Sequence, residues 1–272
     1  MTQASPISIS VVAGQTFLLF NIDDIKYVRQ LGIVGSLVGT LPAAPQQNLF
    51  LGVPLQLMAE EALWLVEHGY AKLIPDDRFI RDIYDHLSDS DIMLIERELE
   101  QTRQKERSWK IQEHQAKLDR LGVTKRGGSN DKELIEQGLT VVVNNTPSRL
   151  PSYVFFKRLY EESDILQKNL LSGLRKDTLS YRVFSYLKST GYYMAPGLRF
   201  GGRYIAYPGD PLRFHAHLIV NCVGWNEDIG LVNMVGGGRL ATGVKKLWVI
   251  GSQDPDKDQN VQCFSVEWAG FG

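Results

Sequence analysis

The sequence predicts a mixed α/β (α+β) chain, and three observations support that class. At both ends of the 272 residues, short runs that alternate apolar and polar residues are interleaved with apolar residues at helical spacing. Between them, charges of both signs crowd a stretch with few apolar residues after Ile95. We therefore expect a small N-terminal α/β module over residues 1–80, a charged, helical and partly flexible linker over 81–149, and a C-terminal block with a mixed sheet over 150–272.

The N-terminal module is predicted from its order of strands and helices. Residues 7–20 alternate and are interrupted by Ala13-Gly14-Gln15, which predicts a β-hairpin. In chain order we then expect a short helix over 22–30, a strand over 49–53, a helix over 55–68 that Pro54 opens and Gly69 ends, and a strand over 71–74.

The middle segment has helical propensity over 78–121 but a sparse apolar face. We expect a solvated helix or a linker there, with a helix that docks on a partner or on RNA as the alternative. Residues 124–131 are rich in turn formers, and 141–143 are predicted as a short strand.

The C-terminal block alternates helical and strand patterns, which predicts its mixed sheet. We expect helices over 164–174 and 176–189, strands over 192–194, 198–200, 204–207 and 217–223, a helix or turn around 229–235, a helix turn or strand start at 240–244, and strands over 246–251 and 261–268.

Composition and charge exclude several classes of protein. A hydrophobic fraction of 43% is enough for a core, and a net charge of −1 excludes the global basic surface of a non-specific nucleic-acid binder. Two cysteines, Cys222 and Cys263, are too few for a disulfide framework and lack zinc-site spacing, so we expect reduced core thiols in an intracellular protein. The N-terminus lacks a signal-peptide pattern, and no apolar run is long enough for a membrane span.

A phenol, two imidazoles and a lysine pair are the side chains best suited to chemistry. Tyr207 is followed by His215 and His217, and Lys245-Lys246 opens a later apolar run. RNA carries its own nucleophile, the ribose 2′-hydroxyl, so a cleaving enzyme needs a base, an acid and positive charge for the transition state. Tyrosine, histidine and lysine can fill these roles without a metal ion.

The residue pattern leaves the choice within each type open. His215 and His217 are two positions apart and would share one face of a strand. Tyr207 precedes the Pro208-Gly209 turn, which favours it, but Tyr204 stays an alternative. A phenol with a pKa of about 10 is a poor base unless cations lower that pKa. A satisfied histidine, a core tyrosine and a solvated lysine are the structural alternatives.

Arg239 and Trp268 are candidates for binding RNA, because a guanidinium and an indole stack on unpaired bases. An exposed arginine and a core tryptophan are the alternatives. A helix N-terminus or a glycine-rich loop at Gly236-Gly237-Gly238, just before Lys246, is expected to help hold a phosphate, although these glycines match no dinucleotide or P-loop fingerprint. The sequence has no carboxylate cluster with metal spacing, so we expect no metal and no cofactor, and metal-dependent nuclease chemistry is disfavoured.

Several segments resemble the tRNA-splicing endonuclease family, most closely its eukaryotic catalytic subunit that cuts at the 3′ splice site. The resemblance is carried by residues 197–202 (Gly-Leu-Arg-Phe-Gly-Gly) and 207–217 (Tyr-Pro-Gly-Asp-Pro-Leu-Arg-Phe-His-Ala-His). Residues 238–246 and 266–268 continue it, and residues 53–58 match more loosely. The resemblance implies a restriction-endonuclease-like catalytic domain over 150–272.

The resemblance also implies a catalytic triad. Tyr207 would be the base, His215 the acid and Lys246 the group that stabilises charge; the neighbours that it sets aside are Tyr204, His217 and Lys245. The implied reaction is a metal-independent, lyase-type phosphodiester cleavage that leaves a 2′,3′-cyclic phosphate and a 5′-hydroxyl. Arg239 and Trp268 would pinch a bulged intron base.

The implied substrate is intron-containing pre-tRNA, and the implied partners are a second catalytic subunit for the 5′ splice site and two structural subunits. They would form a heterotetramer paired through C-terminal strands. Location in the nucleus, or in the cytosol including the mitochondrial outer surface, fits this expectation. A non-catalytic assembly subunit is the alternative, against which the complete triad argues. A restriction-type DNA nuclease would need an acidic metal cluster that the sequence lacks.

Overall fold

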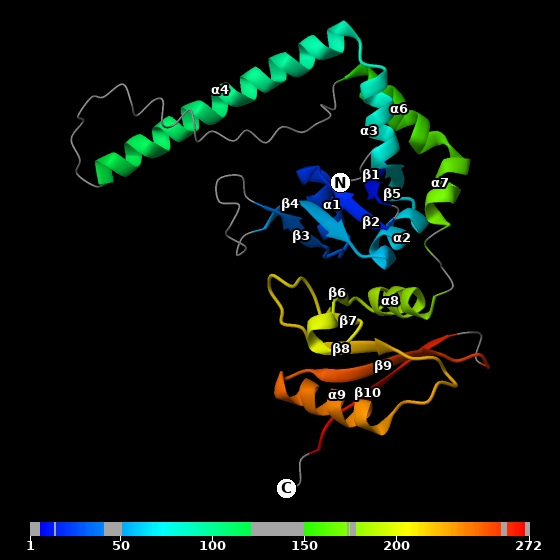
Figure 1. Cartoon of the computed structure of the whole chain (residues 1–272). Coiled ribbons are helices and arrows are strands. Elements are labelled where there is room, and N and C mark those ends of the chain that lie inside the picture. Colours follow the sequence, from blue (N-terminus) through cyan, green and yellow to red (C-terminus); the bar gives the residue numbers. More distant parts are fainter. Residues whose placement is uncertain are drawn as a thin grey trace. The chain divides into compact units, whose positions relative to one another are not determined.

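The structure is a computed structural model that describes residues 6–13, 15–40, 51–120, 150–172, 174, 178–256 and 260–269. Two five-stranded sheets and their helices make up this part of the chain, which confirms the predicted mixed α and β class (Figure 1). The described residues fall into two compact units, one within 1–39, 52–76 and 163–272 and the other within 40–51 and 77–162. Within the described ranges, no helix is both long and apolar enough to cross a membrane.

The N-terminal sheet has the strand order β3-β4-β2-β1-β5. Its strands are β1 (Ile7–Val12), β2 (Thr16–Leu19), β3 (Ser36–Gly39), β4 (Gly52–Leu57) and β5 (Ala71–Pro75). The predicted hairpin is confirmed, because β1 and β2 pair antiparallel, while β1 and β5 pair parallel. The side chains that alternate inward from β1 are fully buried, and they form the centre of the core beneath this sheet.

Helices α1 (Ile22–Gln30) and α2 (Ala59–Glu67) lie between strands of this sheet in the chain order. Helix α1 lies where we expected it, and Asn21 caps it by accepting a hydrogen bond from the Asp23 N–H at 2.8 Å. Helix α2 begins four residues later than predicted. The expected start at Leu55 is wrong because Leu55 and Leu57 alternate inward from strand β4, where both are buried.

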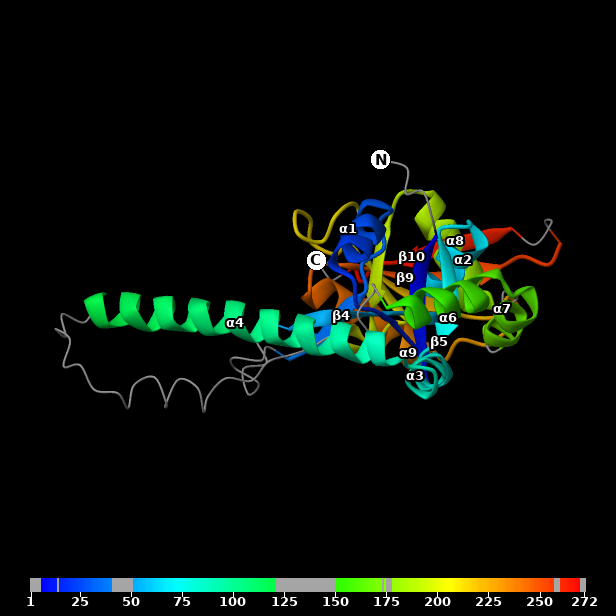
Figure 2. The same ribbon diagram turned by 90° about the horizontal axis from the view of Figure 1, so that it is seen from above.

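The second unit is helical in its described part. It contains α3 (Asp76–Asp85), α4 (Asp89–Arg120) and α6 (Pro151–Glu162), and Figure 2 shows α4 as one continuous helix. The helical stretch expected over 78–121 is thus two helices, because Ser88 begins a new one by exchanging hydrogen bonds with Asp91. The turn expected at 124–131 and the strand at 141–143 lie outside the described residues. The three-part division at residues 80 and 149 stays a prediction.

The C-terminal sheet has the order β10-β9-β8-β7-β6. Its strands are β6 (Tyr193–Pro196), β7 (Tyr204–Tyr207), β8 (Leu218–Cys222), β9 (Leu247–Gln253) and β10 (Val261–Val266). Only β8 and β9 pair parallel, so the sheet is mixed, as predicted. Cys222 and Cys263 are free, half-buried thiols, and burial raises the pKa of Cys222 to about 12.

Helices cover this sheet on both faces (Figure 1). Helix α7 (Asp164–Leu171) leads towards α8 (Leu179–Ser189), and α9 (Leu231–Gly243) connects β8 to β9. Val183 of α8 lies against Gly251, whereas Trp248 lies against Gly237 of α9. Because Trp248 and Gly251 are an odd number of residues apart on β9, α8 and α9 pack on opposite faces.

Two local predictions in this block are wrong. Residues 198–200, expected as a strand, form the 3₁₀ helix η1 (Leu198–Phe200), which Gly201 ends in the left-handed conformation at φ 69°. The glycines 236–238, expected as a loop, lie inside α9. A Cβ built on Gly237 would lie 2.4 Å from the indole of Trp248, so glycine here permits close packing of helix on strand.

One buried core serves both sheets. It joins residues of the N-terminal sheet to Val183, Phe184 and Leu187 of α8 and to Tyr204 of β7. Helix α8 also contacts α2, the helix that packs beside β5. The two sheets of the first unit are therefore held by shared apolar packing as well as by the polar contacts described below.

Candidate active site

A cleft of about 580 Å³ lies beside the end of strand β7. It brings together the three side chains that the sequence singled out for chemistry: Tyr207 from β7, His215 from the segment that follows it, and Lys246 from the residue before β9. The remaining lining residues are Phe200, Ile205, Pro211, Phe214, Ala216, His217, Val244 and Lys245.

Tyr204 lies elsewhere, although the residue pattern could not separate it from Tyr207. It is only 1% exposed and belongs to the shared core. Its hydroxyl donates a hydrogen bond to Glu60 at 2.9 Å and lies 3.1 Å from the Ser180 carbonyl. Tyr204 is thus held inside the protein, whereas Tyr207 is half-buried at the cleft.

The Tyr207 hydroxyl is held in its protonated form. Burial raises the pKa of Tyr207 above its ordinary value of 10.0. A phenol with a raised pKa stays un-ionised at neutral pH, so a base role there depends on positive charge brought close to it.

Backbone hydrogen bonds fix the position of His217 relative to the sheet. The His217 N–H donates to the Ala206 carbonyl at 2.9 Å, and the His217 carbonyl accepts from the Leu247 N–H at 2.8 Å. His217 therefore continues the sheet between β7 and β9. His215 precedes it, and both imidazoles are exposed at the cleft.

The two lysines leave helix α9 in different conformations. Lys245 has φ 55°, the left-handed region that turns the chain out of the helix. Lys246 then leads into β9; its Nζ donates to the Val244 carbonyl at 3.3 Å and lies 5.3 Å from the centroid of the Phe200 ring. The aromatic face and the carbonyl orient the Lys246 ammonium at the cleft.

Arg239 and Trp268 lie together but outside the lining of this cleft. The guanidinium carbon of Arg239, on α9, lies 5.7 Å from the centroid of the Trp268 ring, which follows β10. Arg239 is exposed, and Trp268 is 37% exposed, so both side chains are open to a ligand. The pairing is a cation–π contact on the protein surface.

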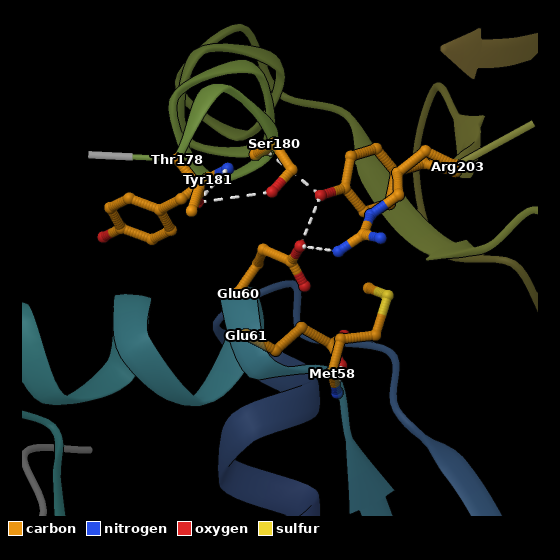
Figure 3. A network of polar contacts seen from close by, with 8 residues as sticks. Met58, Glu60, Glu61, Thr178, Ser180, Tyr181 and Arg203 are labelled. Atoms are coloured by element: carbon orange, nitrogen blue, oxygen red, sulfur yellow. Dashed lines mark hydrogen bonds and ion pairs between the residues drawn. The ribbon is translucent and has the colours of Figure 1, made fainter. Parts of the chain in front are cut away.

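A buried carboxylate of the N-terminal module anchors the start of strand β7. Figure 3 shows Glu60 of α2 facing the guanidinium of Arg203, and the two side chains are 2.6 Å apart. Burial raises the pKa of Glu60, but hydrogen bonds from Arg203, a backbone N–H and Tyr204 together outweigh it and leave this pKa below 4.5. Glu60 is therefore ionised in the folded protein at neutral pH.

A second contact reaches the segment between Tyr207 and His215. Arg29 of α1 donates to the Asp210 carboxylate at 2.8 Å. Sequence reasoning missed this pair and the Glu60 contacts, because the partners are 181 and 144 positions apart. It also assigned no role to Phe200, although Phe200 lies in the motif from Gly197 to Gly202.

A metal site needs several ligating side chains close together. Among the residues that the structure describes, no group of three or more His, Cys, Asp or Glu side chains is placed to hold a metal ion.

Two family models match the sequence. "TSEN34-like, N-terminal domain" matches residues 7–76, and "tRNA intron endonuclease, catalytic C-terminal domain" matches residues 178–263. The chain is 37% identical to the tRNA-splicing endonuclease subunit SEN34 of Saccharomyces cerevisiae, over 94% of this chain and 99% of that protein. It is 34% identical to the probable subunit sen34 of Schizosaccharomyces pombe, over 97% and 98%, and 29% identical to human Sen34, over 96% and 98%.

Proposed function

This chain belongs to the Sen34 family of tRNA-splicing endonuclease subunits, and we propose that it is the subunit that cleaves intron-containing pre-tRNA at the 3′ splice site. The observation that supports this proposal is the convergence of Tyr207, His215 and Lys246 on one cleft. The three groups come from the end of β7, the segment that follows it and the residue before β9, and together they supply the acid, base and positive charge that RNA cleavage needs.

In the proposed reaction, Tyr207 as its phenolate accepts the proton of the ribose 2′-hydroxyl next to the scissile phosphate. The 2′-oxygen then bonds to phosphorus, and the bond from phosphorus to the 5′-oxygen breaks. Protonated His215 gives its proton to the departing 5′-oxygen, which leaves a 2′,3′-cyclic phosphate and a 5′-hydroxyl. Lys246 stabilises the charge that gathers on the phosphoryl oxygens in the transition state.

Substrate binding is proposed to involve the Arg239 and Trp268 pair. A planar base would enter between the Arg239 guanidinium and the Trp268 indole by widening their present spacing of 5.7 Å, and each group contributes stacking without reading the base sequence. The exposed cation–π pair is a surface on which an unpaired intron base could be held.

The proposed assembly pairs this chain with a second catalytic subunit, for the 5′ splice site, and with two structural subunits. Strand β10 supports pairing through the C-terminal strand, because it lies at the end of the sheet order and pairs with β9 on one side. An edge strand presents unpaired backbone groups to another chain. A near-neutral chain also needs partners to hold a highly charged tRNA.

The alternative is a non-catalytic structural subunit of the same complex. Such a subunit would need no set of phenol, imidazole and ammonium groups at one cleft, whereas this chain has all three. The geometry therefore favours the catalytic role.

His215→Ala in the assembled endonuclease tests this function. We expect cutting at the 3′ splice site to fall by about 100-fold or more, since general acid catalysis contributes on that scale, while cutting at the 5′ site is unchanged. His217→Ala is the matched variant, because His217 faces the same cleft; it should keep much more activity than His215→Ala. Wild-type cutting should continue in EDTA. Cutting by His215→Ala at the wild-type rate would rule out His215 as the acid, and loss of wild-type cutting in EDTA would rule out the metal-independent reaction.

A further inference from the structure

The segment between Tyr207 and His215 is organised around a single aspartate. We call residues 208–214 the 208–214 loop. The Asp210 carbonyl accepts hydrogen bonds from the N–H groups of Arg213, at 2.8 Å, and Phe214, at 3.0 Å. The Asp210 carboxylate accepts a third from the Leu212 N–H at 2.9 Å. Asp210 therefore sets the course of the chain that leads to His215.

This loop is joined to the N-terminal module through the same aspartate. Nη2 of Arg29, on α1, lies 2.8 Å from Oδ1 of Asp210. In the part of the chain that the structure describes, this is the hydrogen bond that connects the 208–214 loop to another element. Both residues belong to the first compact unit.

The Arg29 side chain is placed for this contact by its own surroundings. Its Nη1 lies 3.5 Å from the Val34 carbonyl, in the turn that follows α1. The Arg29 and Asp210 side chains are 28% and 38% exposed, so the pair is partly shielded from water. A shielded, hydrogen-bonded ion pair stabilises more than a fully exposed one.

We propose that Arg29 is a positioning residue for cleavage at the 3′ splice site. It does not line the cleft. Through Asp210 it holds the 208–214 loop, and so the His215 imidazole, in register with Tyr207 and Lys246. This inference rests on the proposed function and extends it, because it makes the N-terminal module a determinant of the catalytic geometry.

The physical reason lies in the geometry of proton transfer. An acid must stay within hydrogen-bond reach of the atom that it protonates, and a displacement of about 1 Å can cost about 100-fold in rate. A loop released from Arg29 would spend part of its time in other conformations. We therefore expect loss of Arg29 to slow the cleavage step while substrate binding stays the same.

Single-turnover cleavage by the complete assembled endonuclease tests the proposal. Arg29→Gln and Asp210→Asn should each slow 3′-site cutting by about tenfold at saturating enzyme, with no change in the concentration for half-maximal rate. Asp210→Asn retains an oxygen for the Leu212 N–H, so it removes mainly the charge. The double variant should be no slower than either single variant, because each single change removes the charge attraction of the same ion pair. Arg29→Lys keeps the charge and should recover most of the rate.

Lys26→Gln is the matched control. Lys26 lies on the same helix and pairs with Asp23 at 3.2 Å, but their side chains are 68% and 87% exposed and reach no part of the loop. This variant should cut both sites as the wild type does. The 5′ splice site is a second control within each reaction, because a different subunit is proposed to cut it.

Two results would overturn the inference. Equal slowing at the two splice sites by Arg29→Gln would show that Arg29 serves assembly or stability. Wild-type cutting by both Arg29→Gln and Asp210→Asn would show that the ion pair does not position the loop. His215→Ala in the same experiment separates this failure from failure of the proposed function. If His215→Ala cuts the 3′ site at the wild-type rate, the proposed catalytic function is wrong, whatever the Arg29 variants do.

Discussion

The Tyr204 hydroxyl lies 2.9 Å from the Glu60 carboxylate, so a buried acid of one sheet module meets the first residue of the strand that ends at Tyr207. Arg203 approaches the same carboxylate oxygen at 2.6 Å. The N-terminal module therefore holds the chain on both sides of Tyr207. Glu60 binds the residues before it, and Arg29 binds Asp210 after it.

Glu60→Gln should lower the free energy of unfolding by about 1–3 kcal/mol, because an amide loses the charge that faces Arg203. Urea denaturation of the purified chain measures this. Glu162→Gln is the control: its carboxylate pairs with Arg158 on an exposed helix face, so its loss should change the urea midpoint much less than Glu60→Gln does.

The stability difference between the wild type and Glu60→Gln should depend on pH, and its direction follows from the pKa of Glu60. The pKa of Glu60 is lower in the folded protein than its ordinary value of 4.5 in the unfolded chain. Ionised Glu60 therefore stabilises the fold at pH values above its pKa in the unfolded chain. This stabilisation is lost as the pH falls through its pKa in the folded protein. The stability difference between wild type and Glu60→Gln should be full above about pH 5 and shrink in more acidic solution. A difference that stays constant in acid would contradict this account.

Gly237→Ala should destabilise the chain, whereas Gly236→Ala on the same helix should stabilise it. A Cβ at Gly237 meets the Trp248 indole at 2.4 Å, and overpacking of this kind costs about 1–3 kcal/mol. A Cβ at Gly236 meets nothing within 4 Å, and alanine there gains about 0.5–1 kcal/mol of helix propensity. Thermal unfolding of the two variants should shift in opposite directions, and shifts of the same sign would show that α9 moves away from Trp248 easily.

Trp268→Ala should weaken binding of pre-tRNA and leave assembly intact. Stacking on one base is worth about 1–3 kcal/mol, so the enzyme concentration for half-maximal 3′-site cutting should rise by about tenfold. Trp225→Ala is the control, because Trp225 is similarly exposed, at 38%, and its ring packs near that of Phe264. Loss of the complex on gel filtration in Trp268→Ala would instead make Trp268 part of an interface.

The rate of 3′-site cutting should rise with pH while His215 keeps the proton that it gives to the 5′-oxygen, and should level off once His215 loses that proton. Burial raises the pKa of Tyr207 above 10.0, so its phenolate fraction grows about tenfold for each pH unit well below that pKa. Tyr207→Phe should cut slowly and lose this rise in single-turnover profiles. A Phe variant that keeps both the rate and the slope of the wild type would exclude the phenol as base.

The elements that the sequence predicted well are those whose signal is local. The β-hairpin, α1 and β7 follow from residues next to one another, and Tyr207 and His215 are separated by seven residues. The start of α2 was misplaced because Pro54 was read as a helix opener, while the burial of Leu55 and Leu57 depends on neighbouring strands.

The contacts that connect the modules had no local signal. Glycines 236–238 were expected in a loop because glycine disfavours helices, yet the indole of Trp248 requires a residue without a side chain at Gly237. The partners Arg29 and Asp210 are distant in the sequence, and a single chain carries no pattern that pairs them. The features that the sequence did not predict are therefore those that depend on packing and ion pairs between residues far apart in the chain.

The core shared through α8 has a consequence for synthesis of the protein. The N-terminal sheet is complete once Pro75 has been made, but the Phe184 and Leu187 side chains that help to cover it arrive only with α8. A growing chain on the ribosome therefore carries open apolar surface until α8 emerges, and this interval is when a chaperone or premature aggregation would compete with folding.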